Sequence, residues 1–267
     1  MKNLQYQIDG TDLKKIQSEQ TKILRAFDQI CRDNDLRYSI EGGTLMGAYK
    51  FKGFVPWDDD IDVVMPRADY EKFLVVASKI KNGFSVHTYK NNKYHILNYC
   101  KYRMDGTIYK EKLNQHLDMN HGLFIDIFPL DEVNLDKYQS QARLISFFYK
   151  IRWYKLGYRK KNLLFSLIFS LLPNRLLVKI IDKIIKSQND KGNAYLYEIC
   201  NYNPKFKPIP KEWFDDLVDI EYEGILVKAV SKYQEYLNAR FSDLSSLPPE
   251  NERVPSHQIV EVKLRCE

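Results

Sequence analysis

The sequence predicts an α+β fold in which helices flank a mixed β-sheet core and a basic helical region follows. Residues 12–34 place apolar side chains, from Leu13 to Cys31, at the spacing of an amphipathic helix. Short apolar segments bounded by turn residues indicate strands, and they span residues 36–40, 60–63, 84–89, 96–102 and 124–128. Further helices are expected over residues 68–80, 175–186 and 228–240.

Length and composition indicate a globular protein. The 267 residues are 44% hydrophobic and 28% charged, which is typical of a globular chain and argues against a disordered one. We expect a core over residues 1–135, basic amphipathic helices over 136–200, and a C-terminal segment over 201–267 that packs back on the core. The four cysteines form no CxxC pair and the N-terminus has no apolar signal region, so we expect a cytoplasmic protein without a zinc motif.

An acidic stretch holds four aspartates within five positions: Asp58, Asp59, Asp60 and Asp62. In an extended chain Asp60 and Asp62 would lie on one face, about 6–7 Å apart, with Ile61 and Val63 facing the core. Carboxylates this close repel each other unless a cation neutralises them, and oxygen ligands suit Mg²⁺ or Mn²⁺. The alternative is an acidic turn before a buried strand.

A glycine pair precedes the aspartates. Gly42 and Gly43, followed by Thr44, come directly after an expected strand, and glycines there let backbone N–H groups approach a phosphate. Lys50 and Lys52 follow, ahead of a loop. Such a pair is also compatible with a plain turn.

The expected strand 124–128 carries one charge in its middle, at Asp126. A carboxylate buried among apolar residues is costly unless it is paired, and a metal shared with Asp60 and Asp62 would resolve that cost. A lysine or a backbone amide would resolve it as well. His121, just upstream, is either a phosphate or proton-transfer group or a structural histidine.

Lys101 and Arg103 alternate on one face of an expected strand. Two bases on one face could hold a diphosphate, although exposed charges on strands are also common.

Three stretches resemble the LicD family. They are GGTLMGAYKFKGFVPWDDDIDVVMPRADYEKF from Gly42, HGLFIDIFPLDEV from His121, and a closing segment with Tyr236-Leu237, Arg240-Phe241 and LPPENERVPSH, which ends at His257. Gln258 stands where many members have a second histidine, which leaves the role of His257 open.

The resemblance implies a nucleotidyltransferase-like catalytic core that transfers phosphocholine from CDP-choline to a sugar hydroxyl of a teichoic acid or lipopolysaccharide precursor, releasing CMP. Asp60, Asp62 and Asp126 would hold two Mg²⁺ (or Mn²⁺) ions and carry the catalysis, with Asp126 as a candidate general base. Substrate contacts would come from Gly42, Gly43, Thr44, Lys50, Lys52, Trp57, Asp58, Asp59, Lys101, Arg103 and His121.

Two other classes of function stay open. One is a different transferase on the same core, which moves glycerol phosphate or ribitol phosphate onto a glycan or a nucleotide onto a small molecule. The other is a metal-stabilised binding module without activity, although DDDID lacks the glycine and distal glutamate of a calcium-binding EF-hand loop.

Choline requires aromatic faces, because a quaternary ammonium donates no hydrogen bond. Trp57 lies beside the acidic stretch, and four tyrosines lie between the two blocks: Tyr94, Tyr99, Tyr102 and Tyr109. We expect Trp57 and some of these tyrosines to form a choline box, with ordinary core packing as the alternative.

The positive charge is concentrated in residues 137–186, which hold 12 Lys and Arg and one acid, Asp182. The apolar run Leu163–Leu172 is shorter than the roughly 20 residues of a membrane span. Basic amphipathic helices suit peripheral contact with an anionic inner leaflet, where a lipid-linked glycan acceptor would be found. A solvated basic layer is the alternative, and the absence of a nucleic-acid-binding motif argues against a nucleic-acid partner.

Overall fold

The computed structural model describes residues 10–156, 172–241, 244 and 247–265. Its centre is a mixed sheet with strand order β1-β2-β6-β4-β3, extended by β7 and β8. The bounds are β1 Ser39–Ile40, β2 Asp62–Pro66, β3 Phe84–His87, β4 Cys100–Met104, β6 Phe124–Val133, β7 Tyr195–Tyr197 and β8 Ile209–Pro210. Strands β2 and β6 are parallel, and β6 is antiparallel to β4 and β7. The predicted α+β class with a mixed sheet is confirmed.

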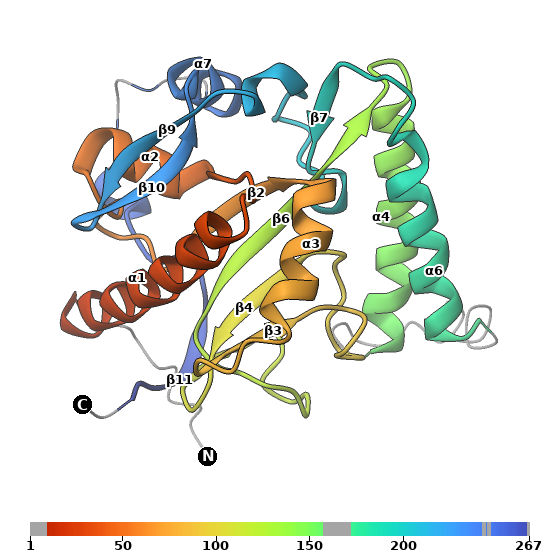
Figure 1. The fold of residues 1–267 in the computed structure, drawn as a ribbon. Helices are drawn as coiled ribbons and strands as arrows, with labels where there is room; N and C mark the ends of the chain where they lie inside the picture. Colours follow the sequence, from red (N-terminus) through yellow and green to blue (C-terminus); the bar gives the residue numbers. More distant parts are fainter. Residues whose placement is uncertain (1–9, 157–171, 242–243, 245–246, 266–267) are drawn as a thin grey trace.

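Helices α1 (Gly10–Asp33) and α3 (Arg67–Ala77) lie across one face of the sheet (Figure 1). The apolar stripe of α1 explains its position, because Ile16, Ile23 and Phe27 are fully buried in the main core. The predicted amphipathic helix is therefore confirmed. The face of the sheet that α1 and α3 cover is apolar, which leaves the opposite face available for polar side chains.

A second group of elements lies beside β1, at the upper left of Figure 1. Helix α2 (Gly42–Phe51) connects β1 to the acidic loop, and it lies near α7 (Tyr233–Arg240). The antiparallel hairpin of β9 (Leu217–Tyr222) and β10 (Ile225–Val230) also contacts α2. Near the C-terminus, β11 (Ile259–Lys263) pairs with β5 (Ile108–Glu111).

Helices α4 (Tyr138–Lys155) and α6 (Asn174–Ile185) form a pair at the side of the molecule (Figure 1). Ile145, Ile181 and Ile185 build a second core there with residues of β7 and its neighbours. No helix in the described part of the chain is long and apolar enough to cross a bilayer. The run Leu163–Leu172 lies almost entirely outside the described residues. Short 3₁₀ helices complete the chain at Lys186–Gln188, Ile199–Asn201, Lys211–Phe214 and Glu250–Glu252.

Several expected elements have other bounds in the structure. The strand expected at 36–40 is only Ser39–Ile40, and the one expected at 60–63 begins at Asp62. The expected helix 228–240 is wrong at its start, because residues up to Val230 pair with β9 and the helix begins at Tyr233. The strand expected at 124–128 continues to Val133, because β2 and β7 pair with its second half. The strand expected at 96–102 begins only at Cys100.

Candidate active site

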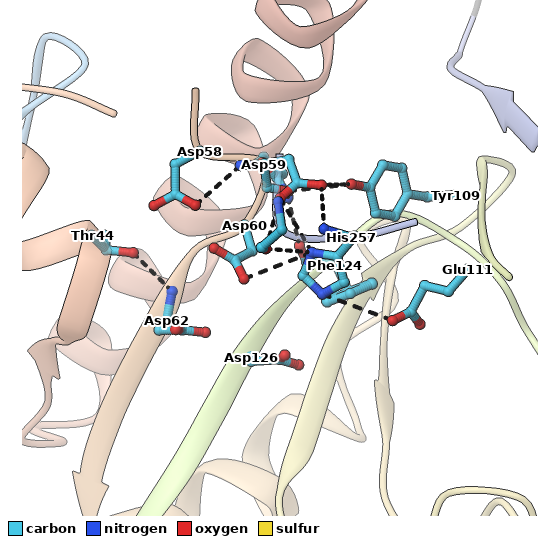
Figure 2. Close-up of polar contacts among 12 residues, drawn as sticks. Thr44, Asp58, Asp59, Asp60, Asp62, Tyr109, Glu111, Phe124, Asp126 and His257 are labelled. Carbon is cyan, nitrogen blue, oxygen red and sulfur yellow. Dashed lines mark hydrogen bonds and ion pairs between the residues drawn. The ribbon is translucent and has the colours of Figure 1, made fainter. Parts of the chain in front are cut away.

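The centre of the candidate site is the junction of β2 and β6. Because these strands are parallel, Asp62 lies in register with Asp126, and neighbouring strands run about 4.8 Å apart. Ile61 and Val63 are fully buried, as their alternation with the aspartates predicts. Figure 2 shows Asp60, Asp62 and Asp126 around one region of the sheet face. The three aspartates that were predicted from two separate blocks are thus brought together.

The start of α2 is attached to β2 at Asp62. The backbone N–H of Glu41 donates to the Asp62 carbonyl (2.9 Å), and the Asp62 N–H donates to Thr44 Oγ1 (2.9 Å). Gly42 has φ of +52°, a left-handed conformation that favours glycine. A Cβ on Gly43 would lie 2.6 Å from Asp58 Oδ2. The glycine pair therefore allows the helix to begin directly against the carboxylates.

The carboxylates of this site are held in a way that suits a cation. Asp58, Asp59 and Asp60 offer oxygens within 4.8 Å of one another. Burial, together with the charge of Asp60, raises the pKa of Asp58 to about 8. Burial also raises the pKa of Asp62, and the charges of Asp60 and Asp126 add to the effect. A divalent cation would remove this cost, so the residues fit a metal, although this close set shares only Asp60 with the predicted ligands Asp60, Asp62 and Asp126.

Asp59 has a different environment from its neighbours. Its carboxylate is fully buried and accepts hydrogen bonds from Tyr109 Oη (2.7 Å) and from the N–H (3.0 Å) and Oγ (2.9 Å) of Ser256. The His257 N–H also donates to it (3.3 Å). Burial alone would raise the pKa of Asp59, but the hydrogen bonds from His257, Tyr109 and Ser256 lower it. Asp59 therefore fastens the C-terminal segment to the acidic loop.

His257 is a site residue that the sequence left unplaced. Its Nδ1 lies 3.3 Å from Asp59 Oδ1 and 3.8 Å from Asp60 Oδ2, and its Nε2 lies 3.8 Å from Glu111 Oε1 (Figure 2). Burial opposes protonation, but the bond to Asp59 and the charge of Asp60 raise the pKa of His257 to about 9. The imidazolium therefore offsets part of the negative charge. In the sequence, the only indication of a role for His257 was its position at the end of LPPENERVPSH, which resembles the LicD family.

Asp126 is also paired with a lysine. Lys101 lies in register with it on β4, and Lys101 Nζ is 3.1 Å from Asp126 Oδ1 and 3.2 Å from Oδ2. Burial raises the pKa of Asp126, and the charge of Lys101 opposes that rise. The lysine partner that the sequence left as an alternative is thus present beside the aspartate cluster.

Arg103 follows Lys101 on the same face of β4 and is almost completely buried. Its Nη1 donates to the Gly122 carbonyl, and its guanidinium lies 4.8 Å from the centre of the Phe124 ring. Arg103 and Asp126 line the same cavity.

Other predicted substrate contacts lie elsewhere or have partners of their own. Lys52, which directly follows α2, pairs with Glu221 of β9 (3.2 Å), and Lys50 is half-buried in the last turn of α2. The Arg253 guanidinium lies 5.4 Å from the centre of the Trp57 ring. His121 Nε2 lies 3.1 Å from the Leu117 carbonyl. Burial lowers the pKa of His121.

The tyrosines of the expected choline box are dispersed. Tyr102 is fully buried against Phe73, on the core side of β4, and Tyr109 binds Asp59. Tyr94 lies against the ammonium of Lys93, which is 4.6 Å from the ring centre. Tyr99 alone of the four lines the cavity beside Asp126.

A buried ion-pair network supports the start of α2. Arg240 Nε lies 2.9 Å from Glu41 Oε1, and Arg240 Nη2 lies 2.8 Å from Glu198 Oε1. Tyr236 Oη also donates to Glu41 Oε2. Glu41 directly precedes the glycine pair. Through Arg240 and Tyr236, helix α7 therefore helps to hold the start of α2 beside the aspartates.

Comparison with known proteins agrees with this arrangement. Residues 35–155 match the family model described as "LicD/FKTN/FKRP, nucleotidyltransferase domain". Residues 35–155 are thus similar to the LicD family, and they are called the LicD-family region below. The LicD-family region contains the glycine pair and all four clustered aspartates, and it extends through α4. The predicted family resemblance is therefore confirmed, and His257 and Arg240 lie outside the matched region.

A relative of the chain extends the similarity beyond the LicD-family region. Over 251 residues the chain is 27% identical to the lipopolysaccharide cholinephosphotransferase LicD of Haemophilus influenzae. The aligned region covers 88% of this chain and 92% of that protein. An uncharacterized protein of Rickettsia typhi is 29% identical over 77 residues, or 24% of its length. One of Rickettsia prowazekii is 33% identical over 48 residues, or 18% of its length.

Proposed function

We propose that this chain transfers phosphocholine from CDP-choline to a sugar hydroxyl of a cell-surface glycan precursor and releases CMP. The observation that carries the proposal is the pairing of Asp62 with Asp126 in adjacent parallel strands, with Asp60 beside them, inside the LicD-family region. The phosphocholine group is inferred from the H. influenzae relative, whose name states that activity. A teichoic acid and a lipopolysaccharide precursor are both acceptors of the required kind.

Asp60, Asp62 and Asp126 would hold Mg²⁺ or Mn²⁺, as one ion or two. When bound, the metal would neutralise the charge that develops on the phosphoryl oxygens. The buried, mutually repelling carboxylates described above support this assignment, because such a group is costly without a counter-charge.

The residues of the chain have separate tasks in the proposed reaction. The acceptor hydroxyl attacks the phosphorus that carries choline, the bond from that phosphorus to the CMP oxygen breaks, and the hydroxyl proton passes to an Asp126 carboxylate oxygen. Lys101 and Arg103 place positive charge next to Asp126, where the diphosphate would be located. The first turn of α2, with Gly42, Gly43 and Thr44, presents backbone N–H groups to an anion.

The basic helices supply a second part of the proposal, namely peripheral contact with the inner leaflet of the membrane. On α4, the side chains of Leu144 and Phe147 are 46% and 42% exposed, and on α6 that of Leu176 is 43% exposed. Both helices also carry basic residues, including Arg143 and Lys179. Apolar side chains with a basic rim suit an anionic lipid surface, where a lipid-linked acceptor would be reached.

Release of CMP tests the proposed reaction. Purified protein is incubated with CDP-choline and Mg²⁺, with and without a lipopolysaccharide or teichoic-acid precursor, and CMP is quantified. Acceptor-stimulated release that is lost with EDTA and in Asp60→Asn, but kept in the exposed-site control Asp118→Asn, supports the proposal.

Two outcomes would redirect the assignment. Release of CMP from CDP-glycerol or CDP-ribitol in place of CDP-choline would replace choline with another alcohol and keep the site. Pyrophosphate as the product, or full activity in Asp60→Asn, would contradict the proposed reaction.

A further inference from the structure

A cavity of about 150 Å³ opens next to Asp126 on the polar face of the sheet. Its wall includes residues from three separate parts of the chain: Tyr99 and Arg103, Glu111 and Asn114, and Trp153. Cavities of about this volume hold a group as large as benzene in other proteins. A trimethylammonium group is slightly smaller than benzene, so the cavity has room for it.

The cavity is lined by buried polar atoms that lack a partner. Arg103 Nε, His95 Nε2 and Asn114 Oδ1 have no hydrogen-bond partner among the described residues, although the three residues are at most 7% exposed. Buried polar groups in folded proteins are nearly always hydrogen-bonded. Their convergence on one cavity therefore indicates that a polar ligand completes it.

The cavity carries charge of both signs. Arg103 and Lys101 supply positive charge beside Asp126. Glu111 supplies negative charge, and its Oε2 accepts a hydrogen bond from Asn114 Nδ2 (2.8 Å). Burial alone would raise the pKa of Glu111, but the charges of Lys101 and His257 lower it, so the carboxylate is ionised. A zwitterionic ligand matches such a wall better than a simple anion does.

The aromatic side of the cavity is firmly positioned. Tyr99 packs against Phe128 of β6, with 4.6 Å between the ring centres. Trp153 follows Arg152 on α4, and Arg152 is fully buried and donates from Nη2 to the His95 carbonyl (3.0 Å) and from Nη1 to the Ile96 carbonyl. The end of α4 is thereby fixed to the cavity wall.

We propose that this cavity binds the phosphocholine end of the donor. The trimethylammonium group lies against the rings of Tyr99 and Trp153 near the Glu111 carboxylate, and Arg103 faces the phosphoryl oxygens. A quaternary ammonium gains most from aromatic faces in a desolvated site with a nearby anion. This inference rests on the proposed function and differs from the sequence prediction centred on Trp57, whose ring faces Arg253.

The test compares the binding of CDP-choline with that of CMP by titration calorimetry, with Mg²⁺ and without acceptor. We expect wild-type protein to bind CDP-choline more tightly than CMP, and tetramethylammonium to compete with CDP-choline only. Glu111→Gln and Trp153→Ala should each weaken CDP-choline binding about tenfold and leave CMP binding unchanged. Trp153→Phe should recover part of the loss, and Glu261→Gln, on the neighbouring strand β11, is the matched acidic control.

The outcomes separate the two proposals. If wild-type protein binds CMP and CDP-choline equally, or if Glu111→Gln leaves the ratio of the two dissociation constants unchanged, the choline cavity is refuted while the nucleotide site stands. If wild-type protein binds neither nucleotide, the proposed function fails as well.

Discussion

Removal of Arg240 should destabilise the protein strongly and in a pH-dependent way. The Arg240 side chain is fully buried between Glu41 and Glu198, so Arg240→Ala leaves two buried carboxylates without their counter-charge. Loss of one partner from a buried ion pair costs about 3–5 kcal/mol of unfolding free energy. Urea unfolding followed by circular dichroism measures the change, and exposed Arg175→Ala should change it by less than about 0.5 kcal/mol.

The loss of unfolding free energy in Arg240→Ala should depend on pH, and the direction of this dependence follows from Glu198. Burial and the charge of Glu41 already raise the pKa of Glu198 to about 8, above the value of about 4.3 in an unfolded chain. A raised pKa of an acid means that stability is highest where the group is protonated in both states and falls as the pH rises toward 8. The loss in Arg240→Ala should therefore be smaller at pH 5 than at pH 8. An equal loss at both values, or one no larger than that of the control, would refute the reasoning.

Three further predictions follow from the site and the surface. Asp126→Asn should abolish turnover, and it should raise the melting temperature in EDTA because one buried charge that repels its neighbours is removed. A lower melting temperature would show that the ion pair of Asp126 with Lys101 dominates. Gly47→Ala should cost about 1–3 kcal/mol in urea unfolding, because its Cβ would lie 2.9 Å from the Val55 backbone N, and an unchanged midpoint would contradict this packing. In vesicle flotation, wild-type protein should bind anionic vesicles at low salt and neutral ones weakly, and replacing Phe147 with glutamate should reduce binding; equal flotation with both lipids would reject membrane contact.

The sequence predicted those parts of the site that depend on local pattern. Alternation in Asp60–Val63 correctly placed Ile61 and Val63 in the core, and helical spacing correctly identified α1. The lone charge in an apolar strand marked Asp126 as a residue that requires a partner. In each case a short segment carries its own physical signal.

Other parts depend on contacts between distant segments, which no local pattern encodes. The register of Asp62 with Asp126 comes from parallel pairing across more than sixty residues. Both Glu111 and Trp153 line the cavity. The sequence prediction placed Glu111 in the core and Trp153 in the separate basic region. Trp57 was the nearest aromatic residue in sequence, whereas Tyr99 and Trp153 are those that the fold brings next to Asp126.

The attachment of Asp59 to Ser256 and His257 has a consequence for how the protein folds. Apart from Tyr109, the donors to that carboxylate come from Ser256 and His257, which are 197 and 198 positions further along the chain. Contacts of such long sequence separation form late in folding. Until that segment arrives, Asp59 is a buried acid without most of its donors, and the loop that carries Asp58 and Asp60 lacks its anchor. In a nascent chain with β2 and β6 already paired, the acidic loop would thus lack its anchor until Ser256 and His257 are in place.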